Sequence, residues 1–157
     1  MQNRWRTGRS IPALRAGTMA LMGAGLLGNA ASPPHDVRVT VTDLRTEDGQ
    51  VLACLTASPK GFPDCSKDPA ARKLAIPAAK TVVFSFKGVD EGTYAISLLH
   101  DENGNGKADK TLMIPKEGFG FSRDAKVRMG PPSFEDAAFR VGDEKVHQRI
   151  RMRYLFR

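Results

Sequence analysis

Residues 37–42 read Val-Arg-Val-Thr-Val-Thr, and this stretch decides the expected fold. Its apolar and polar residues alternate with a period of two, which is typical of a β-strand with one buried face and one solvent face. Residues 51–55, Val-Leu-Ala-Cys-Leu, form a second apolar run, and the turn sequence 47–50 separates the two. We therefore predict that these two strands pair as an antiparallel hairpin.

Further strand patterns follow, with turn residues between them. We expect an edge segment over 73–78, a buried strand over 81–86, a strand over 93–99, a short extended run over 111–114 and a C-terminal strand over 146–156. No long amphipathic helix is visible in the mature part of the chain. About seven strands with turns between them predict an all-β fold, a two-sheet antiparallel sandwich.

One irregular region is expected to cover the core of this sandwich. Residues 118–134 place three phenylalanines, Phe119, Phe121 and Phe134, among glycines and prolines. Aromatic side chains in turn-forming surroundings favour a long capping loop that packs on the core. A short helix over 133–138, with Ser133 as its N-cap, is expected within this region.

The first thirty residues have the order of a secretory signal peptide. Four arginines, the last of them Arg15, precede an uncharged run over 16–27 and small residues at 28–30. The run is shorter than the roughly 20 residues that span a bilayer, which favours a removed signal over a permanent transmembrane anchor. We predict cleavage after Ala30, a single domain over 31–157 and a periplasmic or secreted location.

The charge of the domain restricts its partners. Loss of the signal removes four arginines and lowers the formal net charge from +7 to +3. Binding to nucleic acid needs a concentrated basic face, so we expect no nucleic-acid partner and instead an unknown envelope component or small ligand. The C-terminal strand aligns His147, Arg149, Arg151 and Arg153 on one face. Two interpretations stay open: these side chains meet acidic polymers, or they keep a strand edge soluble.

The two cysteines of the chain, Cys54 and Cys65, both lie in the predicted domain. An oxidising compartment favours a disulfide between them. The alternative is two unpaired thiols, because a metal or catalytic pair would need histidine or further cysteine partners at ligand spacing.

The segment 101–109, Asp-Glu-Asn-Gly-Asn-Gly-Lys-Ala-Asp, resembles the first part of a calcium loop. Its oxygen ligands would be the side chains of Asp101, Asn103, Asn105 and Asp109 and the backbone carbonyl of Lys107, with a glycine at the sixth position. The twelfth position holds leucine in place of the chelating glutamate, so any Ca²⁺ affinity would be weak. The same residues also form ordinary turns, and the sequence leaves both interpretations open.

No catalytic residues are assigned from the sequence. The three histidines are scattered, and no nucleophile elbow, phosphate loop or zinc spacing is present. The leading hypothesis is therefore a non-catalytic binding or scaffolding module. The alternative is an enzyme of an uncharacterised type that uses His100 and Asp101 as an acid–base pair.

Several short stretches together resemble a known bacterial family. They are Gly-Gln-Val-Leu at 49–52, Ser-Pro-Lys-Gly-Phe-Pro at 58–63, Gly-Thr-Tyr-Ala at 92–95, His-Asp-Glu-Asn-Gly-Asn-Gly-Lys at 100–107, and two longer stretches at 114–122 and 130–139. The chain is similar, over nearly all of its predicted domain, to the exported domain of unknown function 2141. The resemblance implies a secreted or periplasmic β-sandwich like the transthyretin-like and carboxypeptidase-regulatory-like modules, and it implies no reaction.

Overall fold

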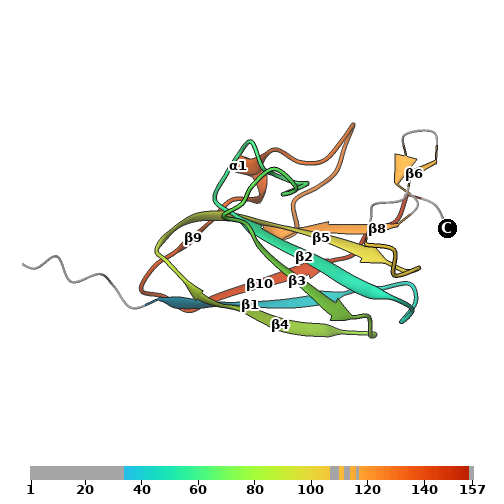
Figure 1. Ribbon diagram of the computed structural model, residues 1–157, viewed down its shortest axis with the longest axis horizontal. Coiled ribbons are helices and arrows are strands. Elements are labelled where there is room, and N and C mark those ends of the chain that lie inside the picture. The colour runs from blue at the N-terminus through green and yellow to red at the C-terminus, as the bar shows by residue number, and fades with distance from the viewer. Residues whose placement is uncertain (1–33, 107–109, 112–113, 116, 156–157) are drawn as a thin grey trace, which may run out of the picture. The chain divides into compact units, whose positions relative to one another are not determined.

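The computed structural model describes residues 34–106, 110–111, 114–115 and 117–155. Almost every element is a strand (Figure 1). The strands are β1 (His35–Thr42), β2 (Gln50–Thr56), β3 (Arg72–Pro77), β4 (Val82–Val89), β5 (Gly92–Asp101), β6 (Lys110–Thr111), β7 (Ile114–Pro115), β8 (Gly118–Phe121), β9 (Phe139–Val141) and β10 (Val146–Arg151). A 3-10 turn, η1 (Ser122–Asp124), and one short helix, α1 (Phe134–Ala137), complete the described elements.

Three strands form the first sheet, in the order β10-β1-β4. β1 pairs antiparallel with β4, so that Val39 lies opposite Phe84. β1 pairs parallel with β10, so that Val41 lies opposite Ile150. This parallel pair is a departure from the all-antiparallel pairing that the sequence predicts.

Five strands form the second sheet, in the order β3-β2-β5-β8, and β9 pairs with the first residues of β5. Every pair in this sheet is antiparallel. A separate two-stranded ribbon joins β6 and β7. The prediction of an all-β, two-sheet sandwich is confirmed, with eight strands in the two sheets.

The main core lies between the two sheets. The period-two alternation in β1 buries Val37, Val39 and Val41 completely. These valines pack in one buried cluster with side chains of both sheets. Its other members are Val51, Ala53, Leu55, Val82, Phe86, Val89, Ile96, Leu98, Val141, Ile150 and Met152. Burial of a whole aliphatic side chain contributes about 1.5–3 kcal/mol, so this cluster accounts for much of the stability of the fold.

A second, smaller cluster lies on the outer face of the five-stranded sheet. It contains Ala95, Phe119, Phe121, Ala125, Phe134 and Ala137. The segment after β8 and helix α1 cover this face, on the side away from β1 and β4 (Figure 1). The Ser133 hydroxyl caps α1 by accepting the Asp136 N–H at 3.2 Å. The predicted cap and the short helix that Ser133 begins are both present.

The two edges of the sandwich are tied across the sheets. At one edge, Phe119 of β8 and Arg153 exchange two backbone hydrogen bonds of 2.9 Å. The preceding residue, Met152, donates its backbone N–H to the carbonyl of Thr42 in β1, also at 2.9 Å. At the other edge, the Arg72 guanidinium of β3 donates to the carbonyls of Lys87 and Gly88 in β4, at 2.5 and 2.6 Å. Side-chain and backbone bonds therefore hold the two sheets together at both margins.

Several strand predictions are wrong. The C-terminal strand expected over 146–156 ends at Arg151, and strand β9 is not predicted from the sequence. The hairpin between 37–42 and 51–55 does not form, because β1 and β2 belong to different sheets. Asp43 and Gly49 adopt positive φ angles of 63° and 70° in the connection that crosses between the sheets. Residues 118–121, assigned above to the capping loop, form strand β8. Alternation identifies a strand and its faces, but it does not identify the partner strand.

Candidate functional site

His100 ends the buried face of β5 and is completely inaccessible to solvent. Its Nε2 atom lies 2.9 Å from the Asp48 carbonyl oxygen, which only accepts, so Nε2 carries a proton. Its Nδ1 atom lies 2.6 Å from the Tyr154 hydroxyl. That hydroxyl accepts the Arg45 backbone N–H at 3.1 Å and directs its own proton at Nδ1. Both ring nitrogens therefore hold loops and the C-terminal segment against the sandwich.

Tyr154 links His100 to the surface. Its pKa is raised above the ordinary value chiefly by burial, so the phenol keeps the proton that this hydrogen bond requires. The Arg45 guanidinium lies over the Tyr154 ring, 4.5 Å from its centroid, and pairs with the Glu102 carboxylate. Glu102 also accepts the Thr46 hydroxyl at 3.0 Å. The Arg45 hydrogen bond outweighs the effect of burial and holds the pKa of Glu102 below its ordinary value.

Asp101 lies on the opposite face of β5 from His100, as neighbouring residues of a strand do. Its carboxylate accepts the Gln50 side-chain amide at 2.9 Å and the backbone N–H groups of Asn105 and Gly106 at 3.0 and 2.8 Å. Burial favours the neutral acid, but these hydrogen bonds outweigh it and hold the pKa of Asp101 below its ordinary value. The structure does not bring His100 and Asp101 together as a pair, since each has its own partners.

The predicted calcium loop is described only in its first part. Asp101, Asn103 and Asn105 lie in a turn, where the Asn103 side-chain oxygen accepts the Asn105 N–H at 3.0 Å. Lys107 and Asp109 fall outside the described residues. Across the described ranges, no group of three or more histidine, cysteine, aspartate or glutamate side chains could hold a metal ion. Calcium binding by this loop stays a prediction.

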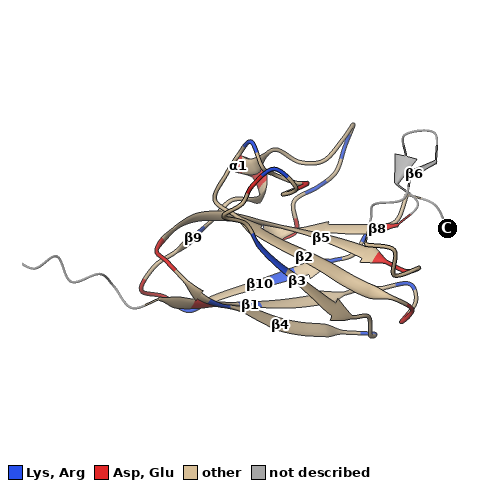
Figure 2. Ribbon diagram, viewed as in Figure 1, with Lys and Arg blue, Asp and Glu red and all other residues tan. Residues whose placement is uncertain are grey.

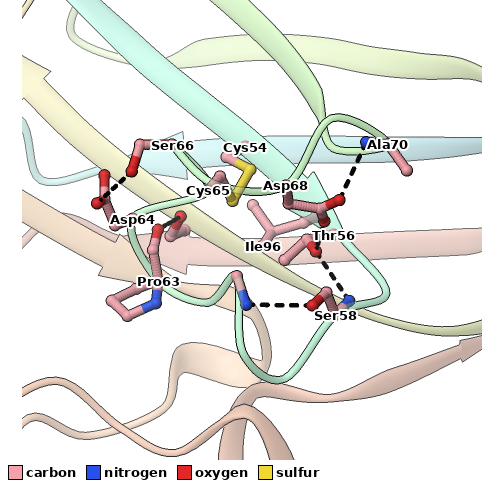
Figure 3. Close-up of a disulfide and its surroundings, with 12 residues drawn as sticks. Cys54, Thr56, Ser58, Pro63, Asp64, Cys65, Ser66, Asp68, Ala70 and Ile96 are labelled. Atoms are coloured by element: carbon pink, nitrogen blue, oxygen red, sulfur yellow. Dashed lines mark hydrogen bonds between the residues drawn. A yellow bond between two sulfur atoms is a disulfide. The ribbon is translucent and has the colours of Figure 1, made fainter.

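The two cysteines lie at bonding distance, as expected. The sulfur atoms of Cys54, on the outer face of β2, and Cys65, in the loop after β2, are 1.94 Å apart (Figure 3). The Thr56 hydroxyl bonds Asp68 close by, and the Ser97 hydroxyl donates to the Pro63 carbonyl at 2.7 Å. The loop between β2 and β3 is therefore fixed on the outer face of the five-stranded sheet by one covalent and several polar bonds.

The outer face of the three-stranded sheet carries the arginines of the C-terminal strand. His147, Arg149 and Arg151 are exposed there, as their alternation in the sequence predicts, and Figure 2 shows the basic segment on β10. Arg153 instead lies beside the sheet junction and pairs with Asp124 at 2.8 Å. The structure adds Arg38 of β1 and Lys87 of β4. We call the surface formed by Arg38, Lys87, Arg149 and Arg151 the basic face.

Sequence reasoning missed two of these associations. Arg45, Glu102 and Tyr154 come from three distant segments, and nothing in their order in the chain indicates that they meet. Arg38 had a signal, since the alternation in residues 37–42 puts it on the polar face of its strand. Only the pairing of β1 with β10 sets Arg38 opposite His147 and next to Arg149.

Comparison with known proteins gives one match. The sequence profile of the family described as "Uncharacterized protein conserved in bacteria (DUF2141)" matches residues 39–149. No significant match was found among curated proteins or among solved structures. Within the described residues, no helix is long and apolar enough to cross a membrane.

Proposed function

Because the chain belongs to the DUF2141 family of bacterial proteins, whose description names no activity, we propose from its own geometry that it is an exported, non-catalytic module that binds or scaffolds at the cell envelope. The observation that carries this proposal is that both ring nitrogens of His100 are hydrogen-bonded inside the protein. A general acid or base must present a ring nitrogen to a substrate. Here both nitrogens are completely buried and hydrogen-bonded within the fold.

The exported location rests on two features of the chain. The first thirty residues have the charge, apolar run and small residues of a signal peptide. The distance between the Cys54 and Cys65 sulfur atoms suits a disulfide, and such bonds persist in the periplasm and outside the cell. Both features support an extracytoplasmic module.

The non-catalytic role is tested by activity profiling. Exported protein purified from its host is incubated with peptidoglycan fragments, glycosides, carboxylic esters and phosphoesters, beside the variants His100→Gln and Asp101→Asn. Glutamine keeps a donor for the Asp48 carbonyl, and asparagine keeps the shape of the Asp101 side chain. We expect no turnover by any of the three proteins and equal retention of all three on isolated envelope fragments.

A turnover that either variant loses while its melting temperature is retained would contradict the proposal. It would establish instead the alternative, an enzyme that depends on His100 or Asp101. Melting curves recorded with the same samples identify a variant that has lost activity only because it has unfolded.

Export is tested by mass spectrometry of the protein recovered from its own host. We expect the mature chain to begin at Ala31 and to be found outside the cytoplasm. A chain that retains Met1 and is found in the cytoplasm would contradict the export proposal.

A further inference from the structure

The two sheets of the sandwich differ in what covers them. The outer face of the five-stranded sheet is covered by the disulfide-anchored loop after β2 and by helix α1 with its flanking segment. On the outer face of the three-stranded sheet, the outward side chains of β1 and β10 are mostly exposed, and no described segment of the chain packs over the centre of the face. This second face is the open sheet surface of the described domain.

Two of the four cations on the basic face are neutralised within the protein. Lys87 lies 2.6 Å from Asp36, and Arg151 lies 2.7 Å from Asp124. Neither Arg38 nor Arg149 has an ion pair or side-chain hydrogen bond with any described residue. Two guanidinium groups are therefore left to a partner.

The strand register sets these two arginines side by side. Arg38 lies opposite His147 and Arg149 opposite Thr40, so the two arginines are diagonal neighbours on adjacent parallel strands. Strand spacing and rise give about 8 Å between their Cα atoms. The Thr40 hydroxyl shares a 2.9 Å hydrogen bond with His147, and Ser85 lies opposite Arg38 on the other side. Two guanidinium forks are thus flanked by hydroxyl groups.

The chemistry of this face favours phosphate. A guanidinium fork binds two phosphate oxygens at once, and hydroxyl donors add to the same contacts. None of the described outward side chains of β1, β4 and β10 is a phenylalanine, tyrosine or tryptophan, so the face offers no large aromatic platform on which a sugar ring or base would stack. Val83, 48% exposed, is its single large exposed apolar side chain, which is too little to insert into lipid.

We propose that the basic face binds a linear phosphodiester polymer of the bacterial envelope, with Arg38 and Arg149 on successive phosphates. This inference rests on the binding function proposed above and names the surface and the partner class for it. A sheet face two to three strands wide suits an extended chain, and phosphates that repeat along such a chain can meet both guanidinium groups.

The test measures the affinity of the exported protein for a linear poly(glycerol phosphate) of several tens of units, at several salt concentrations. The double variant Arg38→Gln/Arg149→Gln is compared with Lys60→Gln/Lys73→Gln, which loses the same charge from exposed positions away from the basic face. We expect binding at least about tenfold weaker in the arginine variant and less than about threefold weaker in the lysine variant. The plot of log K against log salt has a negative slope, and this slope should become shallower by about 1.4 in the arginine variant, as expected for two lost phosphate contacts.

Three results would overturn the proposal. One is an equal loss of affinity in the two double variants, which would reduce the effect to net charge. Another is equally tight binding of polyglutamate of the same length, which would remove the preference for phosphate. The third is binding to phosphatidylglycerol vesicles without binding to poly(glycerol phosphate), which would make the partner a lipid surface. None of these results requires turnover, so they are distinguishable from a failure of the non-catalytic role.

Discussion

Breaking the bond between Cys54 and Cys65 is expected to lower the melting temperature of the protein by about 10 °C. The bridge joins residues with a sequence separation of 11, and the loop-closure entropy of such a link contributes about 3 kcal/mol by restricting the unfolded chain. A domain of about 125 residues unfolds with an entropy of about 0.26 kcal/mol/K, which converts that free energy into a shift of about 10 °C.

The sandwich itself is expected to stay folded without the bridge. Neither cysteine belongs to the cluster between the two sheets, so the main core is unchanged by their loss. The Thr56–Asp68 and Ser97–Pro63 hydrogen bonds still hold the loop after β2 on its sheet. Calorimetry of the wild type with and without reductant, beside the variant Cys54→Ala/Cys65→Ala, measures the shift.

The cysteine-free variant is the control for the reductant, because its melting temperature should be the same with and without reductant. A wild type that melts within about 2 °C of the same temperature in both conditions would refute the entropy argument. Free thiols in unreduced protein from the native compartment, detected by mass spectrometry, would refute the pairing itself.

Three further predictions concern a glycine beside Tyr154, the carboxylate of Asp124 and the loop that begins at Asp101. Gly118→Ala should lower stability by about 1–3 kcal/mol in denaturant titration, because the new Cβ would overlap the Tyr154 ring. Gly142→Ala is the control: its new Cβ would have no neighbour nearer than 3.9 Å, so stability should change by less than about 0.5 kcal/mol. Burial opposes the charge of Asp124, but hydrogen bonds from Arg151 outweigh burial and hold the pKa of Asp124 below its ordinary value of 3.8. The carboxylate therefore contributes its full stabilisation above pH 3.8, and this stabilisation is lost as pH falls through the lower pKa of the folded state. Asp124→Asn should therefore cost about 1 kcal/mol or less at pH 7 and progressively less as pH falls below 3.8, as thermal melts over a pH series would show; a cost that stays constant as pH falls would contradict this. For the loop that begins at Asp101, a calcium site with a Kd of roughly 10⁻⁴–10⁻³ M would add about 1.4–2.7 kcal/mol in 10 mM calcium, whereas identical melting in calcium and in chelator would leave only a turn.

The sequence by itself determined most of the strands, though not β8 and β9, and the buried faces of β1 and β5. The alternation in residues 37–42 predicts the three buried valines of β1, and the alternation around Ile96 and Leu98 predicts the inner face of β5. Ser133 predicts the start of α1. These features follow from local sequence, because side-chain direction alternates along a strand and a helix cap is satisfied within three residues.

Only the tertiary structure decided which strands are neighbours. The pairing of β1 with β10 joins segments more than a hundred residues apart, and it brings Arg38 beside Arg149. The contacts of His100 with Asp48 and Tyr154 likewise join three distant segments, whereas the adjacent residues His100 and Asp101 diverge to opposite faces of one strand. Pairing is chosen by the burial of the whole core and by the connections that can cross it, so no local pattern specifies it.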